Sequence, residues 1–260
     1  VDEKLKWAMW NMTKSSGHYL SLSPYRKIVL DLMHFSAKIP IATVERKMSL
    51  SSVKIARQMS PDKPSWTSIF AKGYGLVARD FPELRRSFMS FPWPKFYEHP
   101  HSIASINVER VVNDENIVIY GYVRGPENRT LIEIDEIIRH HKDDPIEEVR
   151  SYTRTRALSL VPSIIRKFIW WYTLNVEGPR RCHNFGTFAI SSVSSMGAGL
   201  LNLMPILTTQ IHYGMLDKEG NLDVRLTFDH RVLDGATAAR ALVALEDVMK
   251  STLVREMNSE

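Results

Sequence analysis

A histidine at the predicted end of a strand gives the clearest chemical signal in the sequence. His230 follows the strand-like run Leu222–Phe228, and four residues later Asp234-Gly235 turns the chain toward a helical segment. Histidine is the side chain best suited to act as a general base near neutral pH. A strand-to-helix junction can hold such a residue rigidly while it still faces a cleft. A lone histidine in a turn more often bonds the local backbone, so the flanking pattern must decide between the two interpretations.

Other reactive side chains give weaker signals. His140-His141 lies at the charged end of a predicted helix, where cationic side chains interact favourably with the helix dipole. Metal binding by this pair is the less favoured interpretation. His99 and His101 could form a ligand pair, but no third ligand lies nearby in the sequence. Cys182 is the single cysteine, which excludes an internal disulfide and a cysteine-built zinc site and fits a reducing compartment. We therefore expect no metal.

Basic residues are only moderately in excess. The chain has 34 Lys and Arg against 29 Asp and Glu, a net charge of +5, and a pI near 9.2. No nucleic-acid-binding module is recognisable, so we expect no nucleic-acid partner. The segment Arg166–Tyr172 mixes basic and aromatic residues as an interfacial helix does. A helix that packs on the core or closes a substrate pocket is the favoured interpretation, ahead of contact with a membrane surface.

These residues must be positioned by a globular domain. The 260 residues are 44% hydrophobic and 24% charged, which is typical of a soluble protein with one large core or two small ones. No apolar stretch approaches the roughly 18–20 residues of a transmembrane helix. The charged N-terminus lacks the apolar run of a signal peptide, so a cytoplasmic location is expected. We expect residues 1–22 to be an extension, with a start that has been processed, and residues 23–260 to be a single domain.

Strands and helices alternate without a regular βαβ rhythm. Helices are expected from Ser23-Pro24 to about residue 38, over 66–81, from 130 through 138, over much of 145–174 with a break at Pro162, and over 236–249. Strands are expected over 41–49, 102–112, 116–124, 186–193, 208–216 and 222–228, and the second and third form a hairpin. Phe91-Pro92-Trp93-Pro94 must be an irregular loop. The predicted class is α/β, with a mixed sheet covered by helices.

The histidine motif resembles a family signature. Asp229-His230-Arg231-Val232-Leu233-Asp234-Gly235 is similar to the His-x-x-x-Asp-Gly motif of CoA-dependent acyltransferases, and most similar to that of the dihydrolipoamide group. Upstream, residues 185–191 resemble the family's Gly-x-Phe-Thr-Ile-Ser strand. Segments 25–29 and 39–40 resemble its opening helix and the Pro-His pair that follows that helix. Segment 77–84 resembles its helix end and Pro-Glu-Leu turn. Ile41 replaces a family histidine, and residues 145–181 fit the pattern poorly.

The resemblance implies a two-layer, chloramphenicol acetyltransferase-like sandwich and a mechanism without an acyl-enzyme. His230 would be the general base, and Ser191 would donate a hydrogen bond to the oxyanion, although its neighbours Ser192, Ser194 and Ser195 are nearby. Asp234 would pair with Arg26 to fix the loop that orients His230, and Gly235 would permit the turn. The family also implies homotrimers, with coenzyme A as acyl carrier and an active site between subunits.

Three functions follow from the resemblance. The first is a free-standing acyltransferase that moves an acyl group from acyl-CoA to a thiol, hydroxyl or amine acceptor. The second is the catalytic core of a 2-oxo acid dehydrogenase complex, acting on dihydrolipoyl groups carried by another chain, since this sequence has no lipoylation site. The third is a catalytically silent assembly or binding protein. For the acceptor, Trp93, Trp170 and Trp171 could form an apolar pocket, although a role in the core is slightly favoured.

Overall fold

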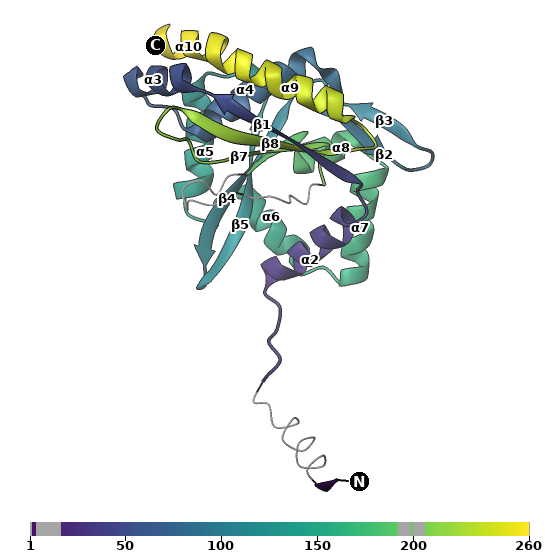
Figure 1. Ribbon diagram of the computed structural model, residues 1–260. Coiled ribbons are helices and arrows are strands. Elements are labelled where there is room, and N and C mark those ends of the chain that lie inside the picture. Colours follow the sequence, from purple (N-terminus) through teal and green to yellow (C-terminus); the bar gives the residue numbers. More distant parts are fainter. Residues whose placement is uncertain (1, 4–16, 192–198, 200–205, 260) are drawn as a thin grey trace.

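A mixed six-stranded sheet forms the centre of the protein in a computed structural model, which describes residues 2–3, 17–191, 199 and 206–259 (Figure 1). The strand order is β1-β8-β7-β6-β4-β5, with β6 parallel to both of its neighbours and the other pairs antiparallel. The strands are β1 (Ile41–Ser49), β4 (Ile103–Val112), β5 (Glu115–Arg124), β6 (Phe188–Ser191), β7 (Thr209–Tyr213) and β8 (Asn221–Asp229). The predicted α/β class with a mixed sheet is confirmed.

Local capping signals set several element boundaries as expected. Ser23 accepts a hydrogen bond from the Arg26 backbone amide and begins α2 (Pro24–Ser36), which has proline in its first turn. Thr130 and Glu133 form a reciprocal capping box at the start of α5 (Leu131–Asp143). Pro162 separates α6 (Arg150–Ser159) from α7 (Ser163–Asn175), because proline cannot continue the preceding helix.

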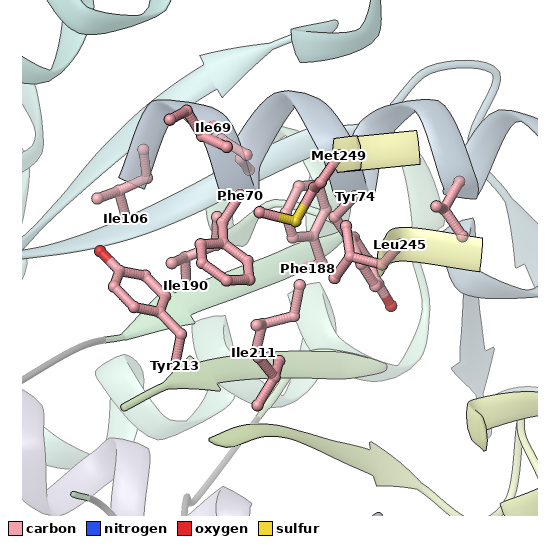
Figure 2. Close-up of a cluster of buried hydrophobic side chains, with 14 of the residues drawn as sticks. Ile69, Phe70, Tyr74, Ile106, Phe188, Ile190, Ile211, Tyr213, Leu245 and Met249 are labelled. Carbon is pink, nitrogen blue, oxygen red and sulfur yellow. The ribbon is translucent and has the colours of Figure 1, made fainter. Parts of the chain in front are cut away.

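One face of the sheet is apolar and carries the larger core. α4 (Trp66–Asp80), α5 and α9 (Gly235–Val248) pack on this face. Alternate strand residues such as Ile106, Phe188 and Phe228 point toward Phe70 and Tyr74 of α4, and all of these side chains are buried. Figure 2 shows Phe70 and Tyr74 close to Phe188, Ile190 and Ile211.

The opposite face of the sheet is polar and is partly covered by α2, α6 and α7. One row of register partners crosses it from β1 to β5 and consists of Thr43, Thr227, Gln210, Ala189, Ser105 and Tyr122. A smaller apolar cluster, including Ile28 of α2 and Trp170 of α7, lies over this face. A buried ion pair between Arg166 of α7 and Asp31 of α2 joins the two helices.

Several short elements were not predicted. These are α3 (Ser51–Met59), β2 (Arg86–Met89), β3 (Lys95–Glu98), α8 (Gly178–Phe185) and α10 (Val254–Ser259). β2 and β3 form a separate two-stranded sheet, joined by the predicted irregular loop at Phe91–Pro94. In the described part of the chain, no helix has both the length and the apolar character needed to cross a membrane.

Candidate active site

The turn after β8 presents His230 at the protein surface. The His230 backbone amide donates a hydrogen bond of 2.8 Å to the carbonyl of Pro40, which ties the turn to the segment between α2 and β1. Behind it, the amides of Val232 and Leu233 both donate to the Asp229 carbonyl. The His230 side chain is exposed in the single chain. Its backbone is therefore fixed while its imidazole remains accessible to a substrate.

A charged clamp formed by Asp229 and Arg231 stiffens this turn. Asp229 is fully buried and accepts hydrogen bonds from the Arg231 backbone amide at 3.0 Å, from Nε at 2.9 Å and from Nη2 at 2.6 Å. The Arg231 guanidinium also lies over the Phe88 ring, 4.4 Å from its centroid. Bidentate charge-assisted pairs of this kind hold geometry well. Sequence reasoning missed this role, although side chains two residues apart in extended chain share one side, and that spacing could have suggested the pair.

The predicted Asp234–Arg26 ion pair is wrong for this chain. Asp234 is the N-cap of α9, where its carboxylate accepts from the Thr237 backbone amide at 2.8 Å, and this bond holds its pKa below the usual value. Arg26 instead pairs with Glu115 of β5, with Nε 3.3 Å from Oε1. The physical reason is distance: Arg26 lies in the first turn of α2, and ten residues of helix, about 15 Å, separate it from the end of α2 near the His230 turn.

The expectation that the turn before α9 requires glycine at position 235 is also wrong. It is not among the residues with positive φ, and a Cβ built on it would have no atom within 4 Å. The turn before α9 is therefore formed by ordinary backbone angles and the Asp234 cap, and an alanine would fit at this position.

Ser191 occupies the end of β6 on the polar face of the sheet. It is 7% exposed, and its strand partner on β7 is His212, whose Nδ1 lies 2.9 Å from the Ser191 carbonyl oxygen. Burial lowers the pKa of His212 below its usual value, so this histidine is neutral at pH 7. The strand partners of Ser191 and His212 continue across the sheet to Arg225 of β8 and Glu45 of β1, which form an ion pair of 2.5 Å. Ser192, Ser194 and Ser195 lie outside the described residues.

A cavity of about 670 Å³ lies between the polar face and helices α2, α6 and α7. Ala189, two residues before Ser191 and on the same face of β6, lines it. Three buried polar atoms in its wall have no hydrogen-bond partner among the described residues: Trp170 Nε1, Asn107 Oδ1 and Ser151 Oγ. Buried polar groups are normally paired, so these atoms indicate where a ligand could bond. Burial also raises the pKa of Tyr122 in the cavity wall to about 12, which keeps it a neutral donor.

Of the three tryptophans, only Trp170 lines this cavity, and it also belongs to the smaller core. Trp93 is exposed on the β2–β3 loop, and Trp171 lies on the outer side of α7 with its ring against Phe91. The cavity is therefore lined by one of these three tryptophans together with residues from several elements, and its use as an acceptor pocket stays a prediction.

Ser191 and His230 do not meet within one chain. Through β7, Ser191 is level with Arg225 of β8, and His230 is five residues further along that strand. This places the two about 16 Å apart along the strands and about 10 Å apart across them, so roughly 19 Å in total. A reaction that uses both residues therefore needs a second copy of the chain.

The remaining candidates have structural partners. His140 pairs with Asp144, and His99 bonds the backbone of His101. Burial raises the pKa of the Cys182 thiol, which makes it a poor nucleophile. Among the described residues, no three His, Cys, Asp or Glu side chains gather as metal ligands would.

The fold matches that of acyltransferase catalytic cores. No protein-family model and no curated protein matches the chain. Solved structures do match, including a probable dihydrolipoamide acetyltransferase from Listeria monocytogenes (TM-score 0.63, 16% identity, 91% of this chain and 95% of that one). A truncated 2-oxoacid dehydrogenase complex core from Thermoplasma acidophilum matches with a TM-score of 0.62 and 18% identity, over 90% and 99% of the two chains.

The dihydrolipoamide acetyltransferase of Azotobacter vinelandii matches with a TM-score of 0.60 and 13% identity, over 92% and 95% of the chains. At these identities the similarity establishes the fold. The chain thus has the fold of these dihydrolipoamide acyltransferase cores, the group that the sequence motif resembles most.

Proposed function

We propose that this protein is a CoA-dependent acyltransferase whose active site is completed by a second copy of the chain. The observation that carries the proposal is the His230 turn, where a rigid clamp presents an accessible imidazole beside a strand-to-helix junction. A serine and a histidine are also among the residues investigated in the catalytic mechanism of the Azotobacter enzyme.

In the proposed reaction, His230 takes the proton from an acceptor thiol, hydroxyl or amine. The acceptor attacks the thioester carbonyl of acyl-CoA, and Ser191 of a neighbouring copy donates a hydrogen bond to the resulting oxyanion. The tetrahedral intermediate then collapses, the carbon–sulfur bond breaks, and the histidine returns its proton to the leaving CoA thiolate. Protons balance and no acyl-enzyme is required. Asp229 and Arg231 act by positioning the turn.

The cavity beside Ser191 is proposed to hold the acceptor. Its walls combine aliphatic side chains with the unpartnered Trp170 Nε1 and Asn107 Oδ1, so it suits an apolar molecule carrying a few polar groups. A homotrimer is the proposed assembly, since a closed ring of copies supplies each Ser191 with one His230.

The complex-core function remains the second candidate, because the matched Thermoplasma acidophilum structure is the core of a 2-oxoacid dehydrogenase multienzyme complex. Assembly mass separates the two: a trimer supports the free-standing enzyme, and a larger shell of trimers supports the core. Measurable acyltransferase activity would distinguish both of these functions from a catalytically silent assembly protein.

The test is release of CoA thiol from a panel of acyl-CoAs with thiol, hydroxyl and amine acceptors. His230→Ala should abolish release while the assembly mass stays unchanged. His101→Ala, which changes another exposed histidine, is the matched control and should behave as wild type. Full turnover in the His230 variant would refute the mechanism.

A further inference from the structure

Helix α7 has an apolar face on each of its two sides. Its inner face buries Arg166, Trp170, Thr173 and Leu174. Its outer face carries large apolar side chains that remain exposed: Ile164 at 86%, Phe168 at 61%, Ile165 at 53% and Trp171 at 36%. A helix that is apolar all round is normally covered on all sides. The outer face of α7 has no such cover among the described residues.

The exposed side chains form one continuous surface. Ile164 and Phe168 are one turn apart, the Phe168 and Trp171 rings stack with centroids 5.9 Å apart, and Phe91 packs against Trp171 at 5.5 Å. Leu160, just before α7, is 78% exposed. We call Leu160, Ile164, Phe168, Trp171 and Phe91 the α7 face. Exposed apolar patches of this kind mark contacts with a partner protein or a membrane.

The charge around the α7 face distinguishes between these partners. Residues 149–176, which include α6 and α7, contain no Asp or Glu and hold five cations, of which Arg154 and Arg156 line the cavity on the inner side of α7. Arg166 is neutralised by Asp31, while Lys167 is exposed directly beside Phe168. A second copy docked face to face would bring two Lys167 side chains into one apolar interface. An anionic lipid surface matches both Lys167 and the aromatic rings, which suit the headgroup level.

The buried Arg166–Asp31 pair also fixes how α7 is presented. It joins the inner face of α7 to α2, and Figure 1 shows α7 along one side of the molecule. The inner face supplies Trp170 to the wall of the cavity. The same helix thus separates the cavity from the exposed apolar surface.

We propose that the α7 face docks on an anionic membrane surface. If the proposed function also holds, the acceptor cavity then lies one helix away from the lipid, a position suited to an amphiphilic acceptor. The docking itself does not depend on catalysis, so it can be tested by binding alone.

The experiment is co-sedimentation of the full chain with two kinds of vesicle. One is phosphatidylcholine alone, and the other contains about one quarter phosphatidylglycerol. We expect binding to the anionic vesicles that weakens as salt is raised. The double variant Phe168→Ser/Trp171→Ser should lose at least about tenfold in affinity, since two aromatic rings no longer leave water. Lys167→Glu should weaken binding severalfold.

Matched controls keep the proposal open to refutation. Ile55→Ser/Met59→Ser removes two exposed apolar side chains on α3, and Lys218→Glu reverses an exposed charge in the turn before β8. Both should bind as wild type, and thermal melting should show that every variant is folded. Deletion of residues 1–16, which include Trp7 and Trp10, should leave binding intact.

Three results would overturn the proposal. These are no binding to anionic vesicles, equal loss in the α3 control, or loss on deletion of the N-terminal residues. A fall in assembly mass of the Phe168/Trp171 variant, with no vesicle binding by wild type, would instead assign the face to contact between copies of the chain.

Discussion

Replacing Asp229 by alanine should be among the most damaging single changes near His230. The carboxylate is fully buried and accepts three hydrogen bonds from Arg231, whose side chain is 31% exposed. Removing one partner of a buried pair leaves the other charge uncompensated, which costs about 3–5 kcal/mol. For a chain of this size each kcal/mol lowers the melting temperature by about 2–4 °C, so we expect a fall of about 10 °C. Because the clamp positions the His230 turn, kcat should fall as well.

The assay compares this variant with Asp234→Ala by thermal and urea unfolding. Asp234 caps α9 from an exposed position, so its loss should lower stability much less than loss of Asp229. In double-mutant cycles Asp229 and Arg231 should couple strongly, while Arg26 and Asp234 should add without coupling, since they do not touch. A larger loss of stability from Asp234→Ala than from Asp229→Ala would refute the clamp. Strong coupling between Arg26 and Asp234 would refute the conclusion that these two side chains do not touch.

Three further predictions concern the polar face of the sheet. Ser191→Ala should lower kcat by about 10²–10³ with little change in melting temperature, as expected for one oxyanion donor; an unchanged kcat would move that role to another group. Trp170→Phe keeps an aromatic ring, although a smaller one, and removes Nε1–H, so the acceptor KM should rise about three- to tenfold. Trp93→Leu, outside the cavity, should leave KM unchanged, and equal KM values for both variants would exclude the cavity as the acceptor site. Burial lowers the pKa of His212 in the folded state, so stability present above the unfolded value of about 6.5 should be lost as pH falls below it. In urea titrations at pH 7 and pH 5, His212→Gln should show a smaller loss than wild type, and an equal loss would contradict the assignment.

Local signals in the sequence predicted much of the fold. Ser23-Pro24 and the Thr130–Glu133 box carry their capping chemistry within four residues, so the helices they begin were predicted correctly. The β4–β5 hairpin was predicted for the same reason, since alternation and a short polar link are both local. Short elements such as β2 and β3 were missed, because four residues are too few to show a period.

The candidate site was predictable only where its residues are close in sequence. The motif identified His230 correctly as the residue after a strand. The partner of Asp234 could not be predicted in this way, because it depends on which residues the fold brings close together. Arg26 is placed by α2 beside Glu115, and no spacing in the sequence reveals that. The cavity has walls from α2, α6, α7 and the four strands β4, β5, β6 and β7, so it exists only once the chain has folded.

The most direct test of the central claim is complementation between two inactive chains, His230→Ala and Ser191→Ala, co-expressed in equal amounts. Within one chain the two residues lie at opposite ends of the sheet, and in the proposed assembly each site takes Ser191 from one copy and His230 from another. In randomly mixed trimers about one quarter of the sites pair an intact serine with an intact histidine. We predict recovery of about one quarter of the wild-type rate of CoA release. A mixture no more active than the two variants measured separately would contradict an active site built between copies.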